Sequence, residues 1–370
     1  MLETYTQNKD KPYITGFTED ELITLVEDLK WPSYKGKQLH SWIYKKSISS
    51  FDEMTNFSVR DRHFLKENYN ITPLQLTEKK VSKDKTIKYL WKLDDNNLIE
   101  SVRMFLEDHN SYSACISSQA GCAVGCPFCA TGTLGLKRNL SASEIADQIL
   151  GIQRDTKERI SNIVFMGQGE PLLNYDEVIK SIHLIKDSVG IGARHITIST
   201  SGIAPAIKKL ALENLQITLA VSLHAPDQKT REYLVPISKK YNMSDLMESL
   251  YYYYEKTKRR ITIEYVMLEN INDDIEQAKA LGDLLKGLHC HVNLIPYNPI
   301  NDVSVYGRIG EPVLHRDILK RPSMAKTYKF KETLEQTSHK KVTIRHERGT
   351  DINAACGQLA NKAVSFQPIT

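Results

Sequence analysis

Three of the six cysteines in this 370-residue chain stand close together, in the stretch QAGCAVGCPFCATG. Cys122, Cys126 and Cys129 are spaced C-x3-C-x2-C on a loop that follows a strand-like run. A structural zinc site needs a fourth ligand, and the nearest candidates, His109 and Cys115, do not stand at the customary spacing. A [4Fe–4S] cluster held by three thiolates, with one iron left open, fits the count better. The alternative is a chance grouping of small buried residues.

An open iron in such a cluster is a place where a second molecule binds. S-adenosylmethionine (SAM) chelates an open iron through its amino and carboxylate groups, which positions its sulfonium for one-electron reductive cleavage. The C-x3-C-x2-C motif at this place in the chain resembles that of the radical SAM superfamily. That resemblance implies a partial (β/α) barrel.

Polar residues that follow the later strand-like runs are candidates for binding SAM. The stretch FMGQGEP carries Gly167, Gly169 and Glu170 directly after one such run. Glycines allow a backbone to approach a ligand closely, and a carboxylate accepts hydrogen bonds from an ammonium group. Turn or cap chemistry explains any single one of these positions equally well. The same place at the end of a run is occupied by Ser199, Ser222, His224 and Asn298.

The elements that must position these residues are visible in the hydrophobic pattern. From about residue 86, short β-rich runs alternate with amphipathic stretches, in one of which Ser141 and Glu144 form a capping box. This alternation predicts an α/β fold with a parallel sheet, a complete or partial (β/α) barrel whose chemistry lies at the carboxyl ends of the strands. The predicted strands are 86–93, 97–106, 113–119, 161–167, 195–202, 215–225, 259–268, 290–298 and 340–346.

Three regions are expected along the chain. The N-terminal part has apolar residues at helical spacing, which predicts a small helical domain over residues 1–85. This domain is our candidate for the RNA-binding domain. The barrel is expected over residues 86–340, and a C-terminal strand and loop with the last cysteine over residues 341–370. Residues 301–328 lack periodicity and are expected to form a long loop or insertion.

The composition is that of an ordinary globular protein with a formal net charge of +4. The sequence has no run of about 18 apolar residues, and its N-terminus lacks the pattern of a signal peptide, so we expect a cytoplasmic protein without a membrane span. We also expect a monomer with reduced thiols. Cations lie beside aromatic residues at 79–92 and 251–260, a combination that suits an RNA backbone and its bases. A solvated charged face over core aromatics is the alternative.

A closer resemblance extends over nearly the whole chain. Its sequence resembles the RlmN/Cfr family of radical SAM RNA methyltransferases, and RlmN, which methylates C2 of adenine, more than Cfr, which methylates C8. The implied substrates are an adenosine of the peptidyl transferase centre of 23S rRNA, numbered 2503, and adenosine 37 of certain tRNAs. Cfr-type C8 methylation, a radical SAM enzyme with a non-RNA substrate, and a non-catalytic RNA-binding module remain alternatives. The resemblance rests on CISSQAGCAVGCPFCATG, GEPLLNY, STSG, SLHAP, TIEYVML, VNLIPYNP and RGTDINAACGQLA.

This resemblance implies roles for two further cysteines. C2 of adenine is an electron-poor carbon that cannot attack the SAM methyl group, so the carbon must be approached by a radical. Cys356 is implied to take a methyl group from one SAM, and a radical from a second SAM then activates that S-methylcysteine to add to C2. Cys115 is implied to release the product by forming a transient disulfide with Cys356. Glu100 is implied to accept the C2 proton, with Glu107 as the alternative because extra residues separate Glu100 from Cys115 here.

The resemblance also implies cofactor contacts and an electron source. The cluster ligands are the three cysteines of the loop, and the reductant is a low-potential donor such as flavodoxin. Two departures stand out: Gln168 replaces the usual methionine, and the 301–328 segment is longer than expected. Cys290 is expected to be an ordinary strand residue. The implied SAM contacts are Gly169, Glu170, Ser199, Ser222, Leu223, His224 and Asn298.

Overall fold

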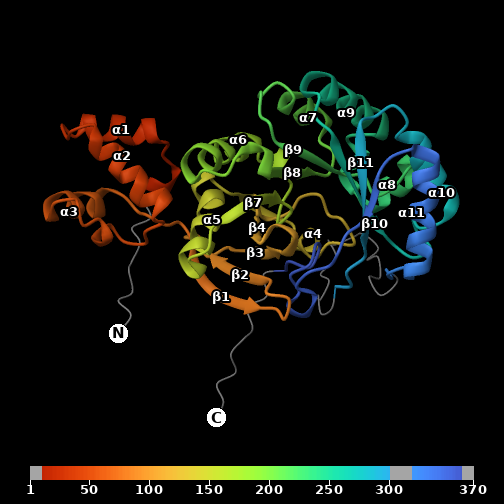
Figure 1. The fold of residues 1–370 in the computed structure, drawn as a ribbon, viewed down its shortest axis with the longest axis horizontal. Helices are drawn as coiled ribbons and strands as arrows, with labels where there is room; N and C mark the ends of the chain where they lie inside the picture. Colours follow the sequence, from red (N-terminus) through yellow and green to blue (C-terminus); the bar gives the residue numbers. More distant parts are fainter. Residues whose placement is uncertain (1–10, 301–318, 361–370) are drawn as a thin grey trace, which may run out of the picture.

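A ten-stranded, mostly parallel sheet curves around the centre of the protein, as the computed structural model shows for residues 11–300 and 319–360 (Figure 1). Each strand of this sheet lies beside the strand that precedes it in the chain, apart from a separate two-stranded hairpin. The strands are β1 (Gln75–Val81), β2 (Ile87–Lys92), β3 (Leu98–Leu106), β4 (Ser111–Cys115), β5 (Gln119–Gly121), β6 (Leu136–Asn139), β7 (Ile160–Phe165), β8 (Ile196–Thr200), β9 (Thr218–Ser222), β10 (Ile261–Met267), β11 (Cys290–Pro296) and β12 (Val342–Ile344).

The sheet is an open barrel rather than a doubly wound sheet. Its first pairings, β1 with β2, β2 with β3 and β3 with β4, are antiparallel. From β4 the order continues through β7, β8, β9, β10, β11 and β12, and every neighbouring pair is parallel. The strand order never reverses, and within the described residues β1 and β12 are the two edges. The radical SAM partial-barrel prediction is therefore confirmed.

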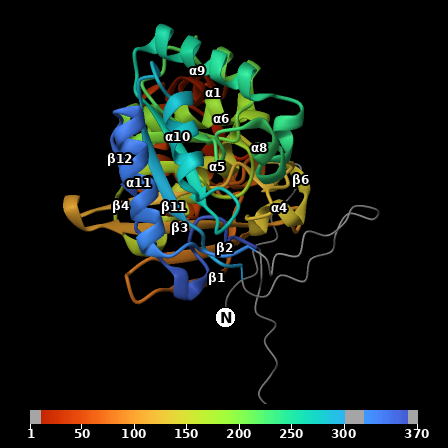
Figure 2. The same ribbon diagram turned by 90° about the vertical axis from the view of Figure 1, so that its right-hand side faces the viewer.

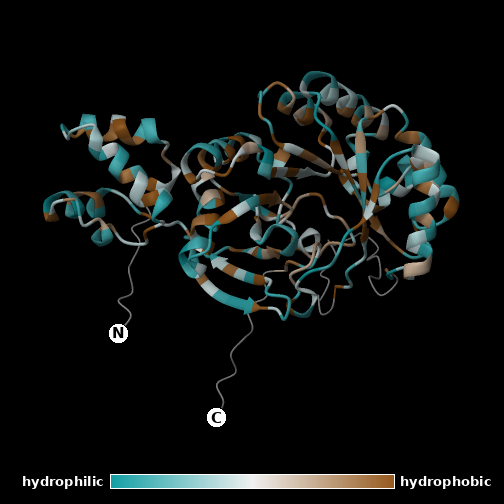
Figure 3. Cartoon of the chain, viewed as in Figure 1, coloured by the Kyte–Doolittle hydropathy of each residue, from teal (hydrophilic) through white to brown (hydrophobic). Residues whose placement is uncertain are grey.

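Helices cover the outer face of the sheet, as Figure 2 shows for α8, α9, α10 and α11. Figure 3 shows both hydrophilic and hydrophobic residues along the helices on the outside of the barrel. The predicted capping box of Ser141 and Glu144 begins α5. The helices are α1 (Glu19–Asp28), α2 (Tyr34–His40), α3 (Val59–Asn68), α4 (Ala130–Leu134), α5 (Ala142–Thr156), α6 (Tyr175–His183), α7 (Ala204–Leu210), α8 (Gln228–Leu234), α9 (Met243–Thr257), α10 (Ile275–Leu284) and α11 (Met324–Ser338).

The pattern of burial explains why the central strands read as nearly continuous apolar runs. All residues of β10 are buried, because helices cover one face of the parallel strand and the barrel interior covers the other. By contrast, most residues of β1 are exposed, so this edge strand has no apolar signature. β1 was therefore missed, and the sheet begins at Gln75, ahead of the boundary expected at residue 85.

Two other segments differ from expectation. The predicted strand 113–119 is divided into β4 and β5 by a short break. Of the expected loop 301–328, residues 301–318 lie outside the described part of the chain, and α11 begins at Met324, inside the expected loop. Cys290 is a buried residue of β11, as expected. No helix in residues 11–300 or 319–360 combines the length and the apolar character needed to cross a membrane.

The aromatic residues of the first basic patch belong to the core. Tyr89 and Trp91 are buried on β2 and stack with a centroid distance of 5.3 Å and an interplanar angle of 8°. The indole Nε1 donates to Ser101 Oγ at 2.6 Å. These rings therefore do not stack on RNA bases, and for this pair the alternative of core aromatics behind a charged surface is correct.

The N-terminal helices α1, α2 and α3 lie to one side of the barrel, as expected for a separate helical region (Figure 1). The phenol of Tyr44 connects this region to the residues that precede α1. It donates to the carbonyl oxygens of Thr15 and Phe17, at 2.7 and 2.8 Å. α1 and α2 approach each other closely at Gly36. A Cβ atom on Gly36 would lie only 2.6 Å from the Cα atom of Ile23.

We predict that Gly36→Ala destabilises the protein although alanine favours helices. The added methyl group meets backbone atoms of α1 that cannot rotate away, so the two helices must separate at a cost of about 1–3 kcal/mol, which exceeds a propensity gain of about 1 kcal/mol. Urea unfolding of the full chain measures the effect. Gly192→Ala is the matched control, because its Cβ would meet nothing closer than His195 Cδ2 at 3.8 Å. Equal stability of the two variants would contradict the prediction.

Candidate functional site

The three clustered cysteines lie on the loop between β5 and α4, at one end of the barrel. Cys122, Cys126 and Cys129 line a cavity of about 170 Å³, which we call the cysteine cavity. The loop is closed at its base by the Cys122 amide, which donates to Gly135 O at 3.1 Å, and within itself by the Cys129 amide, which donates to Cys126 O at 3.2 Å. The motif therefore gathers three sulfur atoms around one space.

The chemistry of these thiols fits an iron–sulfur cluster. Burial raises the pKa of Cys122 to about 12 and raises that of Cys126 well above its ordinary value. Such thiols become thiolates only when a positive centre binds them. Within residues 11–300 and 319–360, no three His, Cys, Asp or Glu side chains come close enough to hold one metal ion. A cluster needs no such convergence, because each thiolate binds a different iron.

The strand before the loop is held by side chains from neighbouring helices. Gln148 on α5 accepts from the Ser117 amide at 2.8 Å and donates to its carbonyl oxygen at 2.9 Å. Asn174, just before α6, donates to the carbonyl oxygens of Ser118 and Leu140, each at 2.8 Å. These bonds satisfy backbone groups where the sheet ladder ends.

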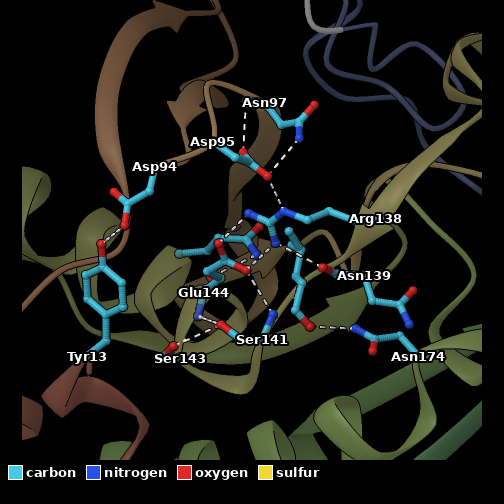
Figure 4. A network of polar contacts seen from close by, with 12 residues as sticks. Tyr13, Asp94, Asp95, Asn97, Arg138, Asn139, Ser141, Ser143, Glu144 and Asn174 are labelled. Carbon is cyan, nitrogen blue, oxygen red and sulfur yellow. Dashed lines mark hydrogen bonds and ion pairs between the residues drawn. The ribbon is translucent and has the colours of Figure 1, made fainter. Parts of the chain in front are cut away.

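A charged network fixes β6, the strand that follows the loop and pairs with β5, as Figure 4 shows. Arg138 on β6 forms two bonds of 2.8 and 2.7 Å with Glu144 and an ion pair with Asp95. Glu144 also belongs to the capping box of α5 with Ser141. The network therefore connects β6 to the start of α5 and to the turn between β2 and β3.

The glycines after β7 are required by packing as well as by the cavity. A Cβ atom on Gly167 would lie 2.6 Å from Ile116 O, and one on Gly169, whose φ is +99°, would lie 2.5 Å from Gln119 Cβ. The sequence interpretation had assigned these glycines to ligand approach. Both also line the cysteine cavity, but the collisions are with the segment that leads to the cysteine loop.

Most of the predicted SAM contacts line the same cavity as the cysteines. Leu223 is the exception: it is fully buried and does not line this cavity. Glu170 accepts from the amides of Leu172 and Ser201, at 3.0 and 2.6 Å, so its carboxylate also holds two strand-end loops together. The predicted residues in the lining are Gly169, Glu170, Ser199, Ser222, His224 and Asn298.

His224 is held in a strained backbone conformation, with φ +61°. Its Nδ1 accepts from the Val266 amide at 3.0 Å, and its ring lies edge-on to Phe128 at 4.9 Å between centroids. Burial, with the nearby Arg231, lowers the pKa of His224 to about 3, so the ring is neutral at physiological pH. With Nδ1 as acceptor, the proton of the neutral ring is on Nε2, which is left as a donor.

Cys356 and Cys115 meet across a second cavity of about 410 Å³ inside the barrel. Both cysteines line this cavity, which we call the interior cavity, and Cys356 also lines the cysteine cavity. Asn298 lines both spaces as well and donates from Nδ2 to Cys356 O at 3.1 Å. Cys356 therefore stands at the junction between the candidate cofactor space and a space large enough for a base.

The segment that carries Cys356 is docked on the cysteine loop and on the first hairpin. Gly357 O accepts from the Ala130 amide at 2.6 Å, and Leu359 O accepts from Thr131 Oγ1 at 2.8 Å. On the other side, Asp84 accepts from the Gly349 amide at 2.8 Å. The conformation that the sequence left open is thus one in which Cys356 is held beside the cluster loop.

Glu100, the predicted proton acceptor, lies beside the site but does not line either cavity. It is 1% exposed, forms an ion pair with Lys88 at 3.1 Å and accepts from the Ala360 amide at 2.7 Å. In this conformation the carboxylate holds the segment after Cys356. The alternative, Glu107, is an exposed residue of a short 3-10 helix. A catalytic role for Glu100 remains a prediction.

Sequence reasoning missed two arginines at this site. Arg231 on α8 is fully buried and donates to three carbonyl oxygens, those of Ser201 at 2.6 Å, Ser222 at 2.9 Å and Leu223 at 2.6 Å. It thereby joins the ends of β8 and β9. Arg345, directly after β12, lines both cavities. Neither belongs to a recognisable local motif, so only the three-dimensional arrangement reveals them.

Comparison with known proteins places this geometry in context. Residues 116–281 match the radical SAM superfamily, and residues 13–71 match the ribosomal RNA large subunit methyltransferase N-terminal domain. A probable dual-specificity RNA methyltransferase RlmN of Alkaliphilus oremlandii is 46% identical over 356 residues, which cover 95% of this chain and 98% of that protein. A protein of Thermotoga maritima with the same description is 45% identical and covers 93% and 96%.

A solved structure agrees with these relatives. The crystal structure of a radical SAM methyltransferase from Sphaerobacter thermophilus superimposes with a TM-score of 0.87 at 37% identity. The match covers 95% of this chain and 99% of the other. The similarity therefore extends over nearly the whole chain.

We predict that Arg231→Leu destabilises the protein by about 3–5 kcal/mol, because three buried carbonyl oxygens lose a charged donor. Arg231→Lys is expected to restore only part of this loss, since an ammonium group cannot reproduce the planar array of donors. Urea unfolding and SAM binding measure the effect on the fold and on the site. Arg260→Leu, which changes an exposed arginine, is the control. Equal unfolding midpoints for Arg231→Leu and Arg260→Leu would refute the prediction.

Proposed function

We propose, from the premise that this chain belongs to the RlmN family of radical SAM RNA methyltransferases, that it methylates C2 of adenine in both rRNA and tRNA. The proposed targets are the nucleotide numbered 2503 of 23S rRNA and adenosine 37 of certain tRNAs. The words "dual-specificity" in the descriptions of its relatives support two classes of RNA substrate. The radical SAM family implies a [4Fe–4S] cluster and SAM as cofactors.

The observation that carries this proposal is the position of Cys356. A cysteine that only stabilised the fold would need contact with one packed region, but Cys356 lines both the cysteine cavity and the interior cavity. A group attached to its sulfur atom is thus accessible from the cofactor space on one side and from the base on the other. Cys115 lines the interior cavity and is the second thiol needed to release a covalently bound product.

In the proposed reaction, Cys122, Cys126 and Cys129 hold the cluster. With SAM bound, the cluster would supply the electron that converts SAM into a radical able to abstract hydrogen from a methyl group. Cys356 carries that methyl group, taken from another SAM molecule, so that two SAM molecules are used in each turnover. After the hydrogen atom is removed, the carbon on Cys356 adds to C2 of the adenine, which links the RNA covalently to the protein. Loss of the C2 proton then leaves one excess electron, which the cluster would take back.

Release of the product requires an attacking thiolate, supplied by Cys115, and a proton acceptor, for which we propose Glu100. The Cys115 thiolate attacks the sulfur atom of Cys356, which forms a disulfide and detaches the carbon now bonded to the base. The C2 proton must leave during the reaction, and Glu100 is the proposed acceptor. Because its carboxylate accepts from the Ala360 amide, proton transfer to Glu100 requires the segment after Cys356 to shift.

The product identifies the reaction. Anaerobically reconstituted enzyme, incubated with SAM, reductant and a 23S rRNA fragment or a tRNA, should yield 2-methyladenosine, which mass spectrometry of the nucleosides distinguishes from its isomer. An RNA fragment in which guanosine replaces the target adenosine is the control. Formation of 8-methyladenosine in place of the 2-methyl product would assign the enzyme to Cfr-type chemistry.

Variants of the two interior cysteines should fail at different steps. Cys356→Ala is expected to cleave SAM slowly but to transfer no methyl group, and peptide mass spectrometry of the wild-type protein should find a methyl group on Cys356. Cys115→Ala is expected to accumulate RNA crosslinked to the protein, because the adduct forms but the attacking thiol is absent. Cys290→Ala, a buried cysteine of β11 outside both cavities, is the matched control. If Cys115→Ala gave no crosslink, its proposed role would be wrong.

A further inference from the structure

Arg345 occupies the wall between the two cavities. Its Nη1 atom lies 3.3 Å from Met166 Sδ and 3.7 Å from Glu264 Oε2, and its backbone amide donates to Leu294 O at 2.9 Å. Arg345 and Met166 line both the cysteine cavity and the interior cavity. Arg345 therefore shares the interior cavity with Cys115 and both cavities with Cys356, although no motif marks it.

Glu264, the carboxylate partner of Arg345, engages only part of the guanidinium group. Glu264 is buried on β10, and its Oε1 accepts from Asn293 Nδ2 at 3.1 Å. Its Oε2, by contrast, has no hydrogen-bond partner among the described residues and meets the guanidinium only at ion-pair distance. Glu264 thus neutralises Arg345 in part and anchors it to β10, while several donors of the guanidinium remain for other groups.

The surroundings of Cys115 do not favour a thiolate without a cation. Its neighbours in the packed cluster are apolar, namely Val102, Ala354 and Leu359. Burial raises the pKa of Cys115 to about 12, and a negative charge on Cys356 raises it further. Two groups act in the opposite direction: the positive charge of Arg345 and a hydrogen bond from the Met166 amide. Attack on a sulfur atom requires the thiolate, so these two groups determine how readily Cys115 reacts.

Other charged groups face the interior cavity from several elements. The segment before β8 contributes Arg194 and His195, and the residues after Arg345 contribute His346, Glu347 and Arg348. Glu347 is paired with Arg321 at 2.5 Å, and Arg194 donates to Gln216 Oε1 at 3.0 Å. The Lys88 and Glu100 pair from β2 and β3 lies outside the lining. Within the described residues, Arg345 is the cation that acts on Cys115.

We propose that Arg345 is a positioning residue that stabilises the Cys115 thiolate for its attack on Cys356, with Glu264 and Met166 holding the guanidinium in place. This inference rests on the proposed function. In the step concerned, the Cys115 sulfur forms the S–S bond, and the bond between the Cys356 sulfur and the base-linked carbon breaks. The electron pair of that bond leaves with the carbon, which takes up a proton to become the methyl group of the product.

The pH dependence of thiol alkylation tests the inference without RNA. Cluster-loaded, full-length enzyme is treated with iodoacetamide over a range of pH, and peptide mass spectrometry follows Cys115 separately from the other cysteines. Arg345→Gln should lower the rate at neutral pH by about tenfold, equivalent to a pKa rise of about one unit. Arg345→Lys, which keeps the charge, should recover part of the rate. Arg348→Gln removes a positive charge from the same cavity lining and should not shift the profile.

The same variants show whether the pKa of Cys115 also limits the release of the RNA product. In a single turnover, Arg345→Gln should accumulate the crosslinked RNA, and raising the pH should speed its release because more Cys115 is ionised. Identical alkylation profiles for Arg345→Gln and the wild type would overturn the inference. A loss of alkylation at every pH that lysine does not restore would also overturn it, because that behaviour indicates a structural role. Failure of the wild type to methylate RNA would instead refute the proposed function and leave the alkylation result intact.

Discussion

The docking of residues 349–360 against the rest of the fold is the constraint on which the arrangement of sulfur atoms depends. Hydrogen bonds from the Ala130 amide and the Thr131 hydroxyl of α4 place this segment beside the cluster loop, and Asn298 donates to the carbonyl oxygen of Cys356 itself. The strand β4 then fixes Cys115 on the opposite wall of the interior cavity. The sheet forms the walls of the cavities, but the position of this segment determines whether Cys356 lines both of them.

Burial disfavours the charged forms of the side chains in the interior of the site. Burial keeps His224 neutral, raises the pKa of the thiols, and raises the pKa of Glu170 and Glu264. The buried Arg231 and the half-buried Arg345 act differently within this environment. Arg231 has three carbonyl partners and fixes the ends of strands, whereas Arg345 has one loosely placed carboxylate and a sulfur atom. Because Arg345 has few fixed partners, its positive charge is available to stabilise a thiolate.

The sequence predicts those features that depend on neighbouring residues. The cysteine motif, the capping box of α5 and the apolar parallel strands are each encoded within a few positions, and all were predicted. β1 was missed because an exposed edge strand has no apolar alternation. The sequence left open whether the aromatic residues at 79–92 face RNA or the core, because local sequence does not reveal that both faces of β2 are largely buried. Arg345 could not be found in this way, because its significance arises from residues that precede it by 80 positions or more, such as Glu264.

The contacts of the Cys356 segment also affect the order in which the structure forms during synthesis. Ser82 pairs with Asp351, Lys88 donates to Asn353 O, and Glu100 accepts from Ala360, at sequence separations of 269, 265 and 260 residues. The cysteine loop and most of the sheet can form on the ribosome well before these partners emerge. Under the proposed function, the residues that hold the cluster are therefore synthesised well before the residue that carries the methyl group.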